Sequence, residues 1–165
     1  QKDWVKNAYA KGVPMGADLP AGSGNPKFLV QALKDPNSGN LDRIQIVKVT
    51  TKNGKSSEKV FDVVWSGDRE RNAEGKVPAV GNTVDLKTAT YTNTIGSTEL
   101  IGYWEDTDFD PTAYTTYYAR VLEIPTPRWS TQLAVKHNTP LNTTVPATIQ
   151  ERAWTSPIWY TPTSK

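Results

Sequence analysis

The chain has 165 residues, with one histidine and no cysteine, which excludes a disulfide framework, a thiolate zinc site, a cysteine nucleophile and a three-histidine metal site. Lys and Arg total 19 against 17 for Asp and Glu, and the resulting net charge of +2 is too small to indicate nucleic acid or an anionic membrane as the main partner. The 11 glycines, 12 prolines, 6 tryptophans and 7 tyrosines favour strands and turns over helices, and the length suits one soluble domain without a membrane span.

The N-terminal part of the chain gives few regular signals. Residues 1–26 are expected to be irregular and to end in a flexible loop rich in glycine and proline. Residues 28–34 suit a short helix or a strand equally well, because periodicity cannot decide so short a run. The chain does not begin with methionine, so we expect it to be a processed or excised part of a longer protein.

The strongest predicted element is an antiparallel hairpin over residues 43–65. Its first run alternates, which places Ile44, Ile46 and Lys48 on one side of a strand. An Asn-Gly dipeptide follows at residues 53–54, and Asn-Gly between two strand-like runs is the strongest short-range signal for a tight hairpin turn. The return run is rich in β-branched and aromatic residues, as strands are.

Downstream of the hairpin, predicted strands alternate with long connections. Charged residues, glycine and proline indicate a solvated connection over residues 66–82, and four prolines make residues 125–146 irregular. Pro157 predicts that the last strand lies at a sheet edge or contains a bulge. The further strands expected are residues 83–92, 99–104, 116–124 and 149–160.

These elements together indicate an all-β fold. About seven strands with long loops and little helix predict a two-sheet antiparallel sandwich, formed by a single domain over residues 1–165. Sandwich domains carry binding residues on the loops at their strand ends, so candidate site residues are expected there.

The densest acidic segment carries Glu105, Asp106, Asp108 and Asp110. Alternating carboxylates on a short segment resemble the opening of a calcium-binding loop, because Ca²⁺ takes several oxygen ligands. The complete EF-hand pattern is absent, because Pro111 and a threonine occupy the part of the loop in which that pattern requires a glycine. Two interpretations stay open: a Ca²⁺ site formed by these four side chains, or a solvated loop that precedes a strand and holds no cation.

Two strand ends place a tryptophan close to an arginine: Trp65 with Arg69, and Trp129 with Arg128. Such pairs can hold a sugar ring or an acidic group through stacking and forked hydrogen bonds. The alternative is structural, with each tryptophan capping the core and each arginine in an ion pair. Other tryptophans, expected in the core or as anchors between domains, are Trp104, Trp154 and Trp159.

Two polar features are weaker signals. His137 is expected to be an exposed loop residue, although a lone histidine can serve as a base or a ligand. Residues 142–144, Asn-Thr-Thr, match a glycosylation acceptor, a pattern that is common by chance. The sequence contains neither a phosphate-cradling glycine loop nor a nucleophile elbow.

Five segments are long enough to be specific: residues 11–16 (KGVPMG), 42–48 (DRIQIVK), 60–69 (VFDVVWSGDR), 117–129 (YYARVLEIPTPRW) and 150–160 (QERAWTSPIWY). Together they resemble the C-terminal region of a large bacterial family of unknown function. That family is similar to PHP-type (polymerase and histidinol phosphatase) metal-dependent hydrolases. The closing Ser-Pro-Ile-Trp run also looks like the end of related metallophosphoesterase-like proteins, and the resemblance covers essentially the whole chain.

The resemblance implies that the chain is the β-sandwich tail of a longer hydrolase. Metal ligands of the family, including His-x-His motifs, lie in an upstream domain that is absent here, so a divalent metal is expected there and no cofactor in this chain. Family members often look exported, which implies a periplasmic or extracellular location. The first strand of the tail would precede Gln1, so an unpaired sheet edge is expected, which another chain or the upstream portion would fill.

The leading functional hypothesis is a noncatalytic module that braces the catalytic domain of a metal-dependent, phosphoester-type hydrolase. The four candidate binding residues would wall its substrate entrance, and metal activation of water would belong to the absent domain. One alternative is a stand-alone extracellular module that binds glycans through exposed aromatic residues. Another is a structural subunit that completes the sheet of another chain.

Overall fold

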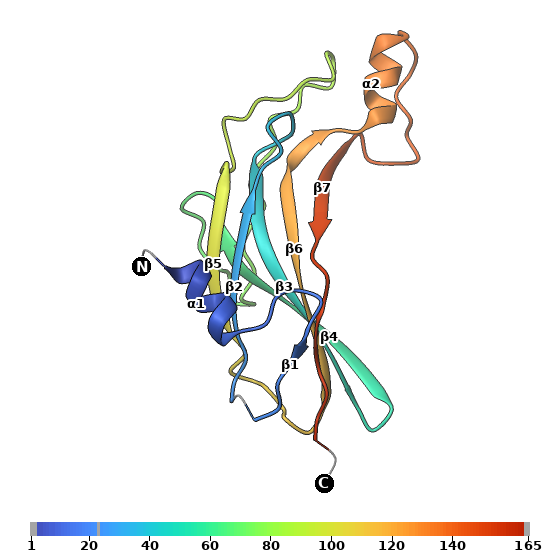
Figure 1. Cartoon of the computed structure of the whole chain (residues 1–165). Helices are drawn as coiled ribbons and strands as arrows, with labels where there is room; N and C mark the ends of the chain where they lie inside the picture. The colour runs from blue at the N-terminus through green and yellow to red at the C-terminus, as the bar shows by residue number, and fades with distance from the viewer. Residues whose placement is uncertain (1–2, 23, 164–165) are drawn as a thin grey trace.

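The computed structural model describes residues 3–22 and 24–163, and it forms two β-sheets that pack face to face (Figure 1). This confirms the all-β, sandwich-like fold. The helices and strands are α1 (Trp4–Lys11), β1 (Asp18–Leu19), β2 (Lys27–Leu33), β3 (Leu41–Lys52), β4 (Lys55–Trp65), β5 (Glu99–Glu105), β6 (Tyr114–Pro127), α2 (Trp129–Lys136), β7 (Thr148–Trp154) and β8 (Ile158–Tyr160).

The larger sheet has the order β1-β8-β6-β3-β4, with β7 also paired to β6. It contains the predicted hairpin of β3 and β4, in which β4 is the edge strand, and the two strands pair from Arg43 opposite Trp65 to Lys52 opposite Lys55. The connecting residues 53 and 54 both have positive φ, as a two-residue hairpin turn of this kind requires. One pairing departs from the antiparallel expectation, because β1 runs parallel to β8.

The smaller sheet contains β2 and β5, paired antiparallel along seven residues each. Residues 28–34 thus lie mostly in a strand, which settles the choice between helix and strand. Alternation directs Phe28 and Val30 toward the larger sheet, and leaves Leu29 on the outer face. Gly102 of β5 allows a close approach, because a Cβ at this position would lie 2.8 Å from a methyl group of Val64.

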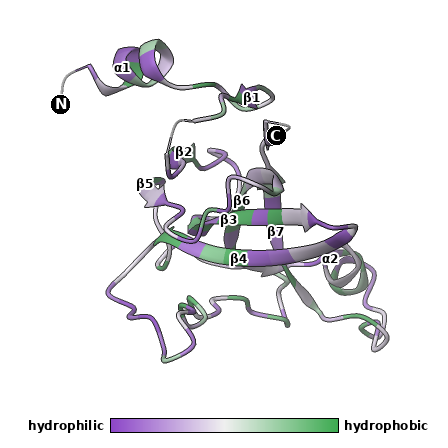
Figure 2. Ribbon diagram, turned by 90° about the horizontal axis from the view of Figure 1, so that it is seen from below, coloured by the Kyte–Doolittle hydropathy of each residue, from purple (hydrophilic) through white to green (hydrophobic). Residues whose placement is uncertain are grey.

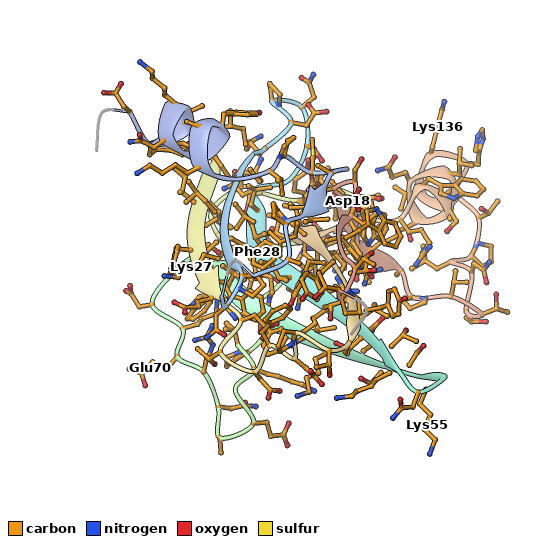
Figure 3. The ribbon with its side chains drawn as sticks, turned by 60° about the horizontal axis from the view of Figure 1, so that its bottom comes forward. Asp18, Lys27, Phe28, Lys55, Glu70 and Lys136 are labelled. Carbon is orange, nitrogen blue, oxygen red and sulfur yellow. The ribbon has the colours of Figure 1, made fainter. Side chains whose placement is uncertain are left out.

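The core lies between the two sheets, where β5 packs over β4 and β2 over β3 (Figure 2). Trp104 belongs to it, as expected, with its ring centroid 4.7 Å from that of Phe61. Phe28 lies among these interior side chains, whereas Lys55 and Glu70 stand at the periphery (Figure 3). The buried apolar clusters consist of Leu41, Ile44, Leu100 and Ala119, and of Phe28, Ile46 and Tyr117.

The predictions for three segments were wrong. Residues 83–92 form no strand of the sandwich: only an isolated bridge joins Asp85 to Thr90, and the threonine-rich run bonds to itself instead of to a neighbouring strand. The irregular segment 125–146 contains the end of β6 and the whole of α2. The irregular segment 1–26 contains α1 and β1, which its weak pattern did not indicate.

The last predicted strand is divided into β7 and β8, and Pro157 lies in a bulge between them. The amide of Thr155 donates to the carbonyl of Ala119, and Ile158 pairs with Tyr117. Two residues of this strand, one of them Pro157, therefore face the single residue Tyr118 of β6. This two-against-one arrangement is a β-bulge, and it confirms the expectation drawn from the proline.

Candidate functional site

The acidic segment seals one end of the sandwich, and its most buried member is Asp106. The Asp106 carboxylate lies 2.6 Å from Nζ of Lys48 and accepts a hydrogen bond of 2.6 Å from the hydroxyl of Tyr117. Both charged side chains are more than nine-tenths buried. Lys48 also donates to the carbonyl of Asp108 at 2.8 Å, so the loop is fastened to β3 through one ammonium group.

The other three carboxylates each face a different lysine. Asp108 pairs with Lys59 at 2.7 Å and Asp110 with Lys52 at 2.6 Å, and hydrogen bonds from these lysines lower the pKa of both carboxyls. Glu105 lies 3.9 Å from a lysine of β2. Within residues 3–22 and 24–163, no three His, Cys, Asp or Glu side chains converge as metal ligands would. The arrangement is that of a loop tied down by ion pairs.

Tyr117 makes the stability of the folded protein depend on pH in the alkaline range. Burial, together with the hydrogen bond to Asp106, raises the pKa of the Tyr117 phenol well above its ordinary value. Above about pH 10 the unfolded tyrosine loses a proton that the folded protein retains. The folded state then binds more protons than the unfolded state, so the stabilisation present at lower pH is lost as pH rises.

We therefore expect the free energy of unfolding in urea to fall steadily from about pH 10 upward. Tyr117→Phe should flatten that decline, whereas the exposed Tyr103→Phe should leave it as in the parent protein. Equal pH slopes for the two variants would show that Tyr117 does not carry the effect.

The pair Trp65 and Arg69 is engaged within the protein. Nε1 of Trp65 donates to the carbonyl of Arg69 at 2.6 Å, and the guanidinium carbon of Arg71 lies 4.8 Å from the centroid of the Trp65 ring. Arg69 pairs with Asp42 at 2.8 Å and donates to the carbonyl of Pro78 at 2.8 Å. These contacts match the structural alternative, in which the tryptophan caps the core and the arginine forms an ion pair.

The second pair lies elsewhere, on the projecting end of the molecule (Figure 1). Trp129 is the first residue of α2 and is 69% exposed, and Arg128 donates to the carbonyl of Pro146 at 3.0 Å. Trp65 is in register with Arg43, which faces Leu122 of β6. The strand continues for five more residues beyond Leu122 before α2, roughly 16 Å, so the two pairs do not form one site.

Three other residues from the sequence analysis are exposed. His137 lies in the turn directly after α2 and is exposed, as expected, and it lines a shallow hollow with Trp129 and Leu133. Trp154 and Trp159 are 59% and 48% exposed, so the core placement is wrong for both. Their role as anchors for another domain stays a prediction.

A buried ionic network on the other face of the larger sheet was not found from the sequence. Arg43 bonds to Asp42 at 3.1 Å and to Asp62 at 3.3 Å, and donates to the carbonyls of Val77 and Pro78, each at 2.7 Å. It fastens the connection 66–82 to the sheet. Charged residues inside an otherwise apolar strand were the available signal, because such residues are buried only when they are paired.

An open cleft of about 540 Å³ lies beside β2, at the edge of the smaller sheet. One wall is formed by consecutive residues of β2, from Phe28 to Gln31, and the opposite wall by β6 and the bulge before β8. Four consecutive strand residues point alternately to two faces, so a cleft that touches all four must run along the edge of the strand. Among the described strands, β2 pairs with β5 alone, and its other edge faces this cleft.

The chemistry of the cleft is uniform. None of the described residues that line it is charged. Helix α1 lines one side of the cleft with Trp4, Val5, Ala8 and Tyr9, although no residue of α1 is buried. The apolar surface continues onto the outer face of the smaller sheet, where Leu29, Leu33, Ile101 and Tyr103 are exposed. These four residues are called the outer patch below.

Comparison with known proteins places the chain in a family. A family model described as "Protein of unknown function (DUF3604)" matches residues 1–162. The chain belongs to this family. No curated protein and no solved structure matches the chain. Within the described part of this DUF3604 chain, no helix is both long and apolar enough to cross a membrane.

Proposed function

We propose that this chain is a noncatalytic β-sandwich module that braces the catalytic unit of a metal-dependent, phosphoester-type hydrolase. The catalytic unit lies upstream in the same protein or on a separate chain, and it supplies the metal ligands. The observation that carries the proposal is the half-covered sandwich, in which two strands face a six-stranded sheet and leave an uncharged cleft. Contiguous apolar surface of this kind marks a contact with another protein unit.

Two further observations support this role. The carboxylates that could serve as metal ligands or general bases are occupied by lysines, which suits a structural module better than a catalytic one. The five segments that resemble the C-terminal region of a family similar to PHP-type hydrolases span the chain from residue 11 to residue 160. In this proposal the catalytic unit covers the outer patch and α1, and the module holds it in place.

The decisive experiment is purification of the native protein, with measurement of its intact mass, its metal content and its hydrolysis of p-nitrophenyl phosphoesters. We expect the residues of this chain to be found together with a catalytic unit that contains His-x-His motifs, and we expect a chelator to abolish hydrolysis. A lone chain of 18.2 kDa without metal or hydrolase activity would contradict the proposal.

The projecting helix gives the proposal a test at a single residue. Trp129 and Leu133 are four residues apart on α2 and both are exposed, so they form an apolar ridge at the end of the sheet. If this ridge walls the substrate entrance, Trp129→Ala should lower kcat/KM of the intact protein by about tenfold, which corresponds to 1.4 kcal/mol. Unchanged kinetics would remove Trp129 from the entrance.

The matched control is Trp159→Ala. Trp159 is also about half exposed, but it lies on β8, away from α2. We expect this variant to keep the kinetics of the parent protein. An equal loss in both variants would indicate a general effect on stability and would not support an entrance at α2.

One observation favours a second candidate function, glycan binding. Trp154 pairs with Arg120 of β6 and Trp159 pairs with Thr116. Thr116, Tyr118 and Arg120 point to the same side of β6, so the two exposed tryptophan rings lie on that side as well, with Tyr118 between them. Four strand residues separate them, roughly 13 Å. A lone chain that loses its tryptophan fluorescence on addition of a soluble polysaccharide would favour this function over the bracing role.

A further inference from the structure

The smaller sheet is short of a strand on the side of the cleft. β5 packs over β4 and β2 packs over β3, while the next strand of the larger sheet, β6, meets the smaller sheet through side chains at the margin of β2, as where the rings of Phe28 and Tyr117 lie 4.7 Å apart. Strands in both sheets are spaced by about 4.8 Å. A strand added to the free edge of β2 would therefore lie directly above β6, in the space that the cleft occupies.

The walls of the cleft fit such a strand. The floor is formed by Ala119 and Val121 of β6, which line the cleft beside the apolar cluster that they share with Val30 of β2. The side wall offers the unpaired peptide groups of β2, which need hydrogen-bond partners. β1, β4, β5 and β7 also have a single partner strand each, but no residue of theirs lines the cleft. Among the strands of the described residues, the edge of β2 alone combines unpaired peptide groups with an apolar floor.

α1 does not supply the missing strand. It is a helix of eight residues with none of them buried, and Tyr9 is 71% exposed although it lines the cleft. A helix of this length is only marginally stable without tertiary packing. α1 therefore stands beside the cleft as a loose cover and leaves the edge of β2 accessible.

We infer that the free edge of β2 accepts an extended segment of the catalytic unit, which adds a third strand to the smaller sheet by β-augmentation. This inference rests on the proposed function. The absence of charge in the lining requires that the segment present uncharged side chains to the cleft, because an unpaired charge there would lose its hydration without compensation. Alternate residues of the segment point down onto Ala119 and Val121, and the others point away.

Hydrogen exchange provides the first test, because strand addition protects backbone amides and a contact between side chains alone does not. In the native protein, the amides of residues 28–32 that face the cleft should exchange at least about 100-fold more slowly than in the isolated 165-residue chain. The amides of β5 that face β2 are paired in both forms and serve as the internal reference. Equal exchange rates in the two forms would overturn the inference.

Cross-linking identifies the occupant. The chain has no cysteine, so Gln31→Cys introduces a unique attachment point for a photoreactive group at the edge of the cleft. We expect adducts with one short, uncharged run of the catalytic unit. Thr90→Cys, in the exposed connection before β5, is the control and should give none with that run.

The other outcomes separate this inference from the proposed function. A native assembly that is intact but gives adducts only from the outer patch, for example from Leu33→Cys, would overturn strand addition and leave the bracing role standing. Adducts between two copies of this chain, or a small apolar molecule retained in the cleft by native mass spectrometry, would also overturn it. Failure to find any catalytic unit would overturn the proposed function itself.

Discussion

Lys48→Met is expected to lower the free energy of unfolding by about 3–5 kcal/mol, because it leaves the buried Asp106 carboxylate without its cation. Asp106 is 1% exposed and would keep two hydrogen bonds but no cation, one bond from the hydroxyl of Tyr117 and one from the backbone amide of Asp108. The loss would be large for a domain whose total stability is about 5–15 kcal/mol. The midpoint of unfolding in guanidinium chloride, followed by tryptophan fluorescence, measures it.

Two further variants show whether burial is the cause. Lys48→Met combined with Asp106→Leu removes both charges, and this double variant should be more stable than Lys48→Met alone, because no unpaired charge stays in the core. Asp108→Asn breaks the neighbouring but exposed pair with Lys59 and should leave the midpoint unchanged. A double variant less stable than either single variant would contradict the expectation.

Arg43→Met is expected to cost a similar amount, about 3–5 kcal/mol, and to loosen the connection 66–82 as well. Asp62 would lose its buried ion pair, and the carbonyls of Val77 and Pro78 would lose the hydrogen bonds from Arg43, although Arg69 still donates to Pro78. Arg43→Lys should restore little of this, because an ammonium group lacks the forked donors of guanidinium.

Limited trypsin digestion gives the structural readout for Arg43. Lys76 and the arginines near it become cleavable when the connection leaves the sheet, so cleavage there should precede global unfolding in Arg43→Met. The control is Arg152→Met, an exposed residue of β7, which should change neither the digestion pattern nor the unfolding midpoint. Resistance of this connection in Arg43→Met would show that other contacts hold it.

The strongest local signals of the sequence predicted the larger sheet well. The Asn-Gly dipeptide and the alternation before it placed the hairpin within two residues of the observed strands, because turn conformation and side-chain period are local properties. Pro157 correctly predicted a bulge for the same reason. Where a pattern had no neighbouring strand to pair with, as at residues 83–92, alternation alone was misleading.

The ion pairs of the candidate site could not be predicted from neighbouring residues, because the partners are far apart in the sequence. Lys48 shares an inward face with two isoleucines, and that placement could have indicated a buried ion pair, but its partner Asp106 is 58 residues away along the chain. The four acidic residues were considered together, as a candidate cation site or a solvated loop, because they are close in sequence. In the folded chain each carboxylate meets a different lysine, and these lysines lie on three strands.

By itself, the sequence determined the class of fold, the hairpin of β3 and β4, and the chemical types that a site in this chain cannot use. These follow from composition, from side-chain period and from turn chemistry, all of which act over a few residues. Only the tertiary structure decided which charges pair and where the apolar surface stays uncovered. Both depend on which strands become neighbours, and the free edge of β2 beside an uncharged cleft exists only after the two sheets have packed.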